Sequence, residues 1–232
     1  MKKQPRCQLV YLDNAATTKI LPQAAKAMIS WLEIECSNPS ASYFPAQKAR
    51  QAIEEARAKV AESINASADE IYFTSGGTES CNLAVIGSAI AMQESGQHIV
   101  TSRIEHPAVL NSMKYLESVG FHITYLDVNA YGVIDINKLK QSLSNETILV
   151  SIMTANNEIG TLEPVDQIGE ITHERGITFH TDAVQAYGQI DLDMQDIGVD
   201  ILSASGHKIG GPKGSGRSEE HTSELQSPSL IS

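Results

Sequence analysis

The stretch Glu70-Ile71-Tyr72-Phe73-Thr74-Ser75-Gly76-Gly77-Thr78-Glu79-Ser80 decides the fold that the sequence predicts. A short apolar run of strand length is followed by two glycines and then by a segment with helical spacing. In a parallel sheet, each strand is joined to the next through such a turn and a helix. The stretch therefore predicts one strand, turn and helix unit of an α/β protein.

Apolar runs of strand length alternate with longer segments of helical period along the rest of the chain. We expect strands at residues 70–74, 98–102, 122–127, 148–154, 177–181 and 200–205, and helices at 23–35, 46–64, 78–93, 108–119, 136–142 and 165–175. In helix 46–64 an apolar stripe runs from Ala49 to Ile64, opposite Glu54, Glu55 and Arg57. The pattern predicts an α/β fold with a mostly parallel central sheet flanked by helices.

Composition and charge exclude several classes of function. The 232 residues are 41% hydrophobic and 19% charged, which suits one globular domain. A formal net charge of −11 without clustered Lys and Arg argues against a nucleic-acid partner. No run approaches the roughly 20 apolar residues of a membrane helix and no signal peptide is evident, so we expect a cytoplasmic protein without a membrane partner. Cys7, Cys36 and Cys81 are widely spaced, which predicts neither a disulfide framework nor a metal site.

Polar residues at the ends of the predicted strands are candidates for a site, because ligands bind beyond the carboxyl ends of parallel strands. Gly76 and Gly77 let the backbone approach an anion, and the helix-start amides with the Thr78 hydroxyl would bind it. Asp182 and Gln185 would face one crevice if a helical turn begins there, and the carboxylate could keep a pyridine nitrogen protonated. Alone, the glycine motif also suits a structural turn, and Asp182 also suits a helix cap.

The run Ser203-Ala204-Ser205-Gly206-His207-Lys208 follows another predicted strand. Lys208 is a candidate Schiff-base amine, because partial desolvation would lower its pKa. His106 in Glu105-His106-Pro107 would lie over an aromatic ring and shuttle protons, and Asn157 would bond a ring hydroxyl. A solvated lysine, a structural histidine and a simple turn are the alternatives. Because all these groups occur together at strand ends, we expect one shared site.

In this order, the motifs Gly-Gly-Thr-Glu-Ser, Glu-His-Pro, Asn-Asn-Glu-Ile-Gly, His-Thr-Asp-Ala-Val-Gln and Ser-Gly-His-Lys resemble those of the cysteine desulfurases, class V aminotransferase-like enzymes of fold type I. The resemblance runs from about Val10 to Gly216. It implies pyridoxal 5'-phosphate as the cofactor, bound as a Schiff base by Lys208. It also implies that His106 stacks on the ring and takes part in proton transfer.

The resemblance implies the remaining cofactor contacts as well. Asp182 would pair with the pyridine nitrogen, Gln185 with the ring hydroxyl, and Asn157 with the ring side of the cofactor. The phosphate would be held by Gly77, Thr78, Ser205 and His207.

The implied activity is removal of sulfur from L-cysteine, giving L-alanine and an enzyme persulfide for iron-sulfur cluster or thio-cofactor assembly. A homodimer and a sulfur-acceptor protein such as an iron-sulfur scaffold are the implied partners. The alternatives are a selenocysteine lyase, another class V aminotransferase-like enzyme, and an inactive scaffold fragment that binds pyridoxal phosphate.

The resemblance divides the chain into an N-terminal segment 1–20, an incomplete cofactor-binding large domain 21–216 and a non-homologous tail 217–232. The tail is polar, shows no strand pattern, and matches the translation of a common sequencing adapter. The family's catalytic cysteine and most of its small C-terminal domain lie beyond Lys208, so we expect this chain to be an inactive fragment. Cys81 stands where the family usually has asparagine, and we interpret it as a packing substitution.

Overall fold

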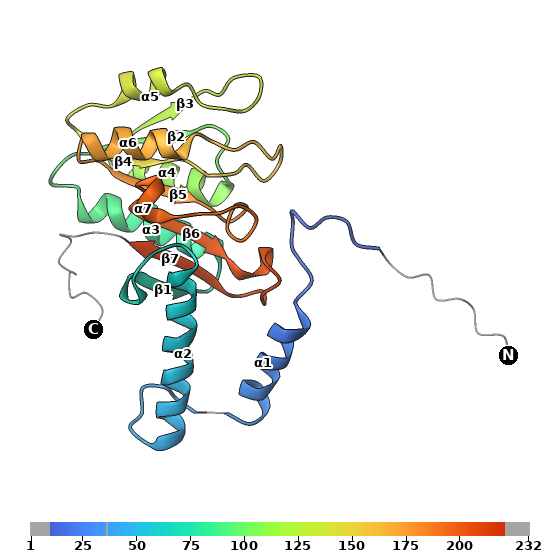
Figure 1. The fold of residues 1–232 in the computed structure, drawn as a ribbon. Coiled ribbons are helices and arrows are strands. Elements are labelled where there is room, and N and C mark those ends of the chain that lie inside the picture. The colour runs from blue at the N-terminus through green and yellow to red at the C-terminus, as the bar shows by residue number, and fades with distance from the viewer. Residues whose placement is uncertain (1–9, 36, 221–232) are drawn as a thin grey trace, which may run out of the picture.

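The computed structural model describes residues 10–35 and 37–220, within which seven strands form one sheet in the order β1-β7-β6-β5-β4-β2-β3 (Figure 1). The strands are β1 (Ile71–Thr74), β2 (His98–Ser102), β3 (His122–Leu126), β4 (Thr147–Ser151), β5 (Thr178–Asp182), β6 (Ile201–Ser205) and β7 (Gly216–Glu220). Strands β2 to β6 pair in parallel, whereas β7 runs antiparallel between β1 and β6. The predicted mostly parallel α/β fold is confirmed.

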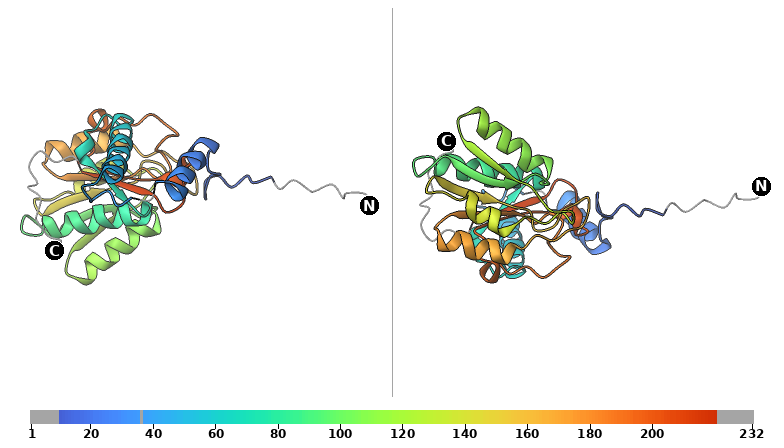
Figure 2. Two further views of the ribbon diagram at one scale, coloured as in Figure 1. Left: turned by 90° about the horizontal axis from the view of Figure 1, so that it is seen from below. Right: turned by 90° about the horizontal axis from the view of Figure 1, so that it is seen from above.

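Helices cover both faces of this sheet (Figure 2). Helices α3 (Gly77–Ala91) and α4 (Pro107–Ser118) lie on one face, and α5 (Ile136–Ser142) and α6 (Val165–Glu174) on the other. A short helix, α7 (Met194–Ile197), also packs against α6. The sequence did not predict α7, because four residues are too few to show a helical period.

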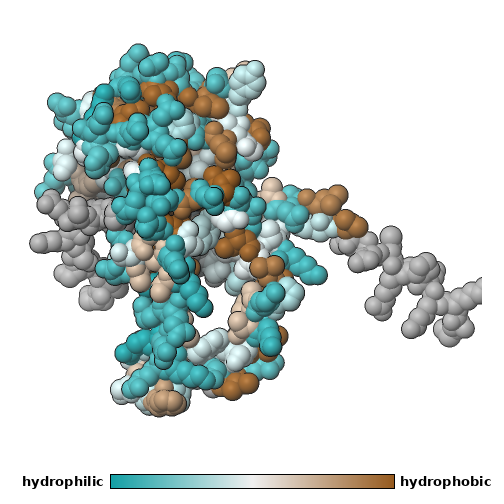
Figure 3. Space-filling model, viewed as in Figure 1, coloured by the Kyte–Doolittle hydropathy of each residue, from teal (hydrophilic) through white to brown (hydrophobic). Residues whose placement is uncertain are grey.

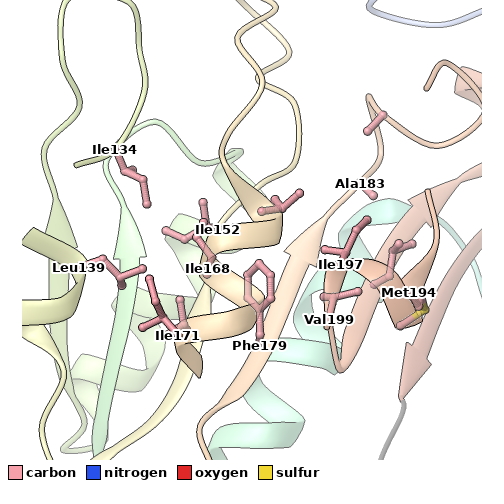
Figure 4. Close-up of a cluster of buried hydrophobic side chains, with 14 of the residues drawn as sticks. Ile134, Leu139, Ile152, Ile168, Ile171, Phe179, Ala183, Met194, Ile197 and Val199 are labelled. Carbon is pink, nitrogen blue, oxygen red and sulfur yellow. The ribbon is translucent and has the colours of Figure 1, made fainter. Parts of the chain in front are cut away.

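The larger buried cluster lies between the sheet and α6. Phe179 of β5 is fully buried and belongs to a cluster with Ile152, Ile168 and Ile171, and Figure 4 shows these side chains together. Strands β4 and β6 are buried at every position, as expected for parallel strands covered on both faces. This burial fixes the positions of the strand ends, where the candidate residues lie.

Helices α1 (Pro22–Glu33) and α2 (Phe44–Glu62) project from the sheet (Figure 1). The predicted apolar stripe on α2 is only partly buried, because Ala49 is buried but Ile53 is 37% exposed, and α1 has no buried residue. Part of the stripe, including Ala49 and Ile53, lines an open apolar groove with Trp31 of α1 and Phe73 of β1, whereas Ile64 is buried in the cluster against the sheet. Apolar surface is accordingly visible along α1 in Figure 3.

The tail shows no strand pattern in the sequence, yet residues 216–220 form the strand β7, so this part of the interpretation was wrong. Hydrogen bonding to β1 on one side and β6 on the other pairs the backbone of this polar segment, which is sufficient for a strand. A Cβ at residue 216 would lie 2.2 Å from the Gly76 carbonyl carbon, so glycine allows this close approach. Residues 221–232 of the predicted tail, together with Cys7 and Cys36, lie outside the described residues.

Among residues 10–35 and 37–220, no helix is both long and apolar enough to cross a membrane.

Candidate functional site

A cavity of about 230 Å³ lies where strands β5 and β6 end. The nine residues that the family resemblance implied for cofactor contacts all line it. These residues are Gly77, Thr78, His106, Asn157, Asp182, Gln185, Ser205, His207 and Lys208. They come from separate segments of the chain, and the parallel sheet brings them together because its strands end at one edge.

The start of α3 and the end of β6 form a small cradle for an anion. No side chain caps the start of α3, so its first backbone amides are free to bind a ligand. A Cβ at Gly77 would lie 2.9 Å from Val184 Cγ2 and 3.4 Å from Ser205 Cβ, and would fill the cradle. The buried Ser205 hydroxyl has no hydrogen-bond partner within the described part of the chain. An anion with several oxygens would satisfy these donors.

Asp182 is a buried carboxyl group at the end of β5. Its Oδ1 accepts a hydrogen bond of 2.9 Å from the Val184 amide, and the Ala183 carbonyl accepts one of 2.8 Å from the Tyr187 amide, so the single helical turn considered from the sequence does follow β5. Burial raises the pKa of Asp182, while the Val184 hydrogen bond and the nearby His106 and Lys208 act to lower it. The cavity thus holds a carboxyl group beside two basic side chains.

His106 has both a structural role and a position at the cavity. It is the N-cap residue of α4, and its Nδ1 accepts a hydrogen bond of 3.1 Å from the Ala108 amide. Pro107 follows at the first helical position, where its missing N–H costs nothing. Since Nδ1 is an acceptor in this cap, the proton of the neutral ring lies on Nε2.

Lys208 ends the 3-10 turn η2 (Gly206–Lys208), directly after β6. Its Nζ donates a hydrogen bond to the Ala15 carbonyl, which also accepts one of 2.9 Å from Gln185 Nε2. Burial lowers the pKa of Lys208, and the carboxylates of Asp182 and Asp13 oppose this change. The amine is therefore easier to deprotonate than that of an ordinary surface lysine.

The N-terminal segment closes one side of the site, which the sequence did not predict. Ala16 lines the cavity, and Thr17 Oγ1 lies 3.1 Å from His207 Nδ1. The Thr18 amide donates a hydrogen bond of 2.9 Å to the His207 carbonyl. Burial, and then the charges of Lys208 and Lys213, lower the pKa of His207. Main-chain contacts of this kind carry no signature in the sequence.

For the segment 156–160, the sequence left two alternatives open, a simple turn and a site residue at Asn157. The structure contains both. Asn156 makes the turn, because its Oδ1 accepts hydrogen bonds from the amides of Glu158 and Ile159 at 2.9 and 3.1 Å. Asn157 is left at the cavity, where its Nδ2 donates to Glu158 Oε1 at 2.9 Å.

Four further lining residues were not predicted for the site, namely Cys81, Met153, Ala155 and Val184. Burial, with a contribution from the charge of Asp182, raises the pKa of the Cys81 thiol well above its ordinary value. A buried, protonated thiol is a poor nucleophile. Among the described residues, no group of three or more His, Cys, Asp or Glu side chains is arranged to hold a metal ion.

The site combines an anion cradle, a buried carboxyl group and a lysine, and it lies beyond the strand ends of a mostly parallel sheet. This combination is typical of a cofactor-dependent α/β enzyme. The chain belongs to the class-V aminotransferase family, whose model matches residues 10–217. Within that family it is similar to proteins named cysteine desulfurase IscS. It is 51% identical to the one from Dictyoglomus turgidum and 48% identical to the one from Methanosarcina thermophila, over 207 residues each.

These alignments cover 89% of this chain but 52% and 51% of the two relatives, so the chain spans about half their length. Solved structures agree with this likeness. SspA in complex with cysteine is 41% identical with a TM-score of 0.88, over 90% of this chain and 60% of that one. A NifS-like protein is 36% identical with a TM-score of 0.91, over 96% of this chain and 62% of that one.

Proposed function

We propose that this chain is the cofactor-binding part of a pyridoxal-phosphate-dependent cysteine desulfurase, which removes sulfur from L-cysteine and leaves L-alanine. The observation that carries the proposal is the single cavity lined by all nine residues expected from the family motifs. The names of the relatives, and a solved neighbour described as a complex with cysteine, support cysteine as the substrate over the selenocysteine lyase alternative.

The anion cradle fits the phosphate of this cofactor. The free amides at Gly77 and Thr78 and the Ser205 hydroxyl, which has no partner in the described chain, would donate to phosphate oxygens. His207 lies at the same side of the cavity and would add a further donor. The start of α3 also favours a negative charge through its helix dipole.

The remaining lining residues fit the ring. Asp182 would accept a hydrogen bond from the pyridine nitrogen and keep it protonated, Gln185 would bond the ring hydroxyl, and His106 would stack on the ring face. When bound, pyridoxal phosphate supplies an electron sink for bond breaking at the substrate amino acid. Asn157 would contact the ring side of the cofactor.

Lys208 and His106 would handle protons and the covalent attachment of the cofactor. Burial lowers the pKa of Lys208, so a larger fraction of its amine is neutral and nucleophilic at a given pH. His106 holds its proton on Nε2 and is a candidate to exchange protons with groups in the cavity.

The thiol that accepts sulfur must come from another cysteine. Cys81 is the only cysteine among residues 10–35 and 37–220, and burial raises the pKa of its thiol, so it is unsuited to nucleophilic attack. A cytoplasmic homodimer that passes its persulfide sulfur to an iron-sulfur scaffold or another acceptor completes the proposal.

The cofactor assignment is tested by adding pyridoxal phosphate to the purified chain. We expect a visible absorbance band from the bond between the lysine and the cofactor, absent in Lys208→Ala and retained in Lys213→Ala, which removes an exposed lysine five residues away. An unchanged band in Lys208→Ala would overturn the assignment of this lysine. Absence of any band in the parent chain would favour a scaffold fragment.

We also propose that residues 217–232 do not come from the family's own sequence, although residues 217–220 extend β7 of the sheet. The family match ends at residue 217, within one residue of this boundary, which supports the division. Sequencing genomic DNA across codon 217 tests it, because a read that encodes the same tail and a stop codon would contradict an adapter origin.

A further inference from the structure

One hydroxyl group, that of Thr18, bridges the turn that carries Lys208. Thr18 Oγ1 donates a hydrogen bond of 2.8 Å to the His207 carbonyl and accepts one of 2.7 Å from the Gly210 amide. The Thr18 amide donates to the same His207 carbonyl at 2.9 Å. Lys208 lies between these two partners in the sequence, so the main chain on both sides of the lysine is bonded to a single residue of the N-terminal segment.

Further contacts hold residues 15–21, here called the N-terminal strap, against the same turn. The Leu21 amide donates a hydrogen bond of 2.8 Å to the Gly210 carbonyl, and Thr17 Oγ1 lies 3.1 Å from His207 Nδ1. Gly210 has a φ of +78°, and a Cβ there would lie 2.5 Å from Leu21 Cγ. Glycine therefore suits both the left-handed backbone of the turn and the close approach of the N-terminal strap.

The N-terminal strap also holds the far end of the lysine side chain. Lys208 Nζ donates a hydrogen bond to the Ala15 carbonyl, which accepts a second one of 2.9 Å from Gln185 Nε2. A lysine has a flexible four-carbon stem, so fixing its main chain alone does not place its amine. Here Thr18 bonds the main chain around the lysine, and Ala15 bonds the amine. Both ends of Lys208 thus depend on one short segment.

We propose that Thr18 is a positioning residue for Lys208, which fixes the turn 206–210 so that the amine lies in the cavity beside Gln185. Its contacts are with the turn, so Thr18 acts through the lysine. An amine that is held in place before it reacts loses less freedom on the way to the transition state, and therefore reacts faster. The consequence for cofactor attachment rests on the proposed function. The effect on the turn and on the amine belongs to the chain and is measurable without cofactor.

The first test follows amide hydrogen exchange by NMR in the purified cofactor-free chain. Thr18→Val keeps the shape of the side chain but removes the hydroxyl, so the Gly210 amide loses its acceptor and should exchange about tenfold faster. Thr18→Ser keeps the hydroxyl and should exchange like the parent. Thr161→Val is the matched control, because this half-buried hydroxyl also donates to a main-chain carbonyl from another segment, that of Tyr131, at 2.6 Å. It should leave the exchange of Gly210 unchanged.

The second test, also without cofactor, measures how the reactivity of Lys208 depends on pH. Competitive acetylation with acetic anhydride, read by peptide mass spectrometry, gives the pH at which Lys208 is half-reactive, with the exposed Lys213 as internal standard. Burial lowers the pKa of Lys208, and the carboxylates of Asp182 and Asp13 oppose this change. When Thr18→Val loosens the turn, water reaches the amine more easily, so its pKa should rise. Thr18→Ser should restore the parent profile.

A third readout adds pyridoxal phosphate. The visible band from the bond between the lysine and the cofactor should form about tenfold more slowly in Thr18→Val than in the parent. It should form at the parent rate in Thr18→Ser and in Thr161→Val. If no band forms in the parent, the proposed function fails, while the exchange and acetylation measurements still decide the role of Thr18.

Equal exchange of the Gly210 amide in the parent and in Thr18→Val would overturn the proposal. Faster exchange with an unchanged pH profile of Lys208 would also overturn it, because Thr18 would then hold the turn without placing the amine. If circular dichroism shows Thr18→Val unfolded, Thr18→Ala takes its place, since it removes the same hydroxyl from a smaller side chain. If both are unfolded, the parent decides: a Gly210 amide that exchanges as fast as in an unfolded peptide would overturn the bridge, and at least about tenfold protection would support it.

Discussion

The substitution Glu105→Gln is expected to stabilise the folded chain, and to do so far more at pH 8 than at pH 5. Glu105 is buried, and its Oε1 accepts hydrogen bonds of 2.7 Å from Ser102 Oγ and 3.0 Å from the Met153 amide. Its Oε2 has no hydrogen-bond partner among the described residues. Burial raises the pKa of Glu105 to about 8, so the folded chain holds this carboxyl protonated at neutral pH.

The size of the effect follows from the pKa difference between the two states. The carboxyl titrates near 4.5 in the unfolded chain and near 8 in the folded chain. Its contribution to stability is therefore fully present below pH 4.5 and is lost as the pH rises towards 8. Between pH 5 and pH 8 this loss amounts to about 3 kcal/mol. A glutamine oxygen can accept the same two hydrogen bonds, and the amide has no proton to release.

Urea unfolding at the two pH values measures this difference for the parent chain and the variant. The gap in unfolding free energy between Glu105→Gln and the parent should widen by about 3 kcal/mol from pH 5 to pH 8. Glu170→Gln, at an exposed position on α6, is the control and should show no such widening. A gap that is the same at both pH values would show that Glu105 is not held neutral and would refute the reasoning.

Further predictions concern glycines and one histidine. Gly169→Ala should destabilise the chain by more than about 2 kcal/mol in urea unfolding, because its Cβ would lie 1.9 Å from the Ile197 carbonyl oxygen. Gly87 lies inside α3, and the atom nearest to an added Cβ is 4.0 Å away, so Gly87→Ala should instead stabilise the chain by about 1 kcal/mol. A chain destabilised more by Gly87→Ala than by Gly169→Ala would contradict this packing argument. Burial lowers the pKa of His180 to about 3, so its contribution to stability is lost as the pH drops below 6.5; in the Glu105→Gln chain, where Glu105 no longer offsets this loss, the urea midpoint should fall over that range, and a flat midpoint would argue against a neutral buried ring. Gly77→Ala should weaken pyridoxal phosphate binding about tenfold in absorbance titrations, by crowding the anion cradle; unchanged binding would place the phosphate elsewhere.

The helices and strands that could be predicted are those in which apolar residues repeat with a clear helical or strand spacing, or in which turn residues mark the end of the element. Residues 98–102 and 136–142 were predicted with the bounds that the structure has, and the other predicted elements differ by at most three residues at either end. The exceptions have physical reasons. Helix α7 is too short to show a period, and β7 exists because β1 and β6 each offer it an unpaired edge.

The sequence by itself determined the order of the elements and the chemistry available at each strand end. Because parallel strands end at one edge, that order sufficed to predict that Asp182, Ser205 and Lys208 share a site. Only the tertiary structure decided that the Ala15 carbonyl meets Lys208, that Cys81 lines the same cavity as Asp182, and that Glu105 is held neutral. A main-chain carbonyl can come from any residue, so such a partner cannot be recognised from residue types. The protonation of a carboxyl group such as Glu105 depends on burial by segments that are far apart along the chain.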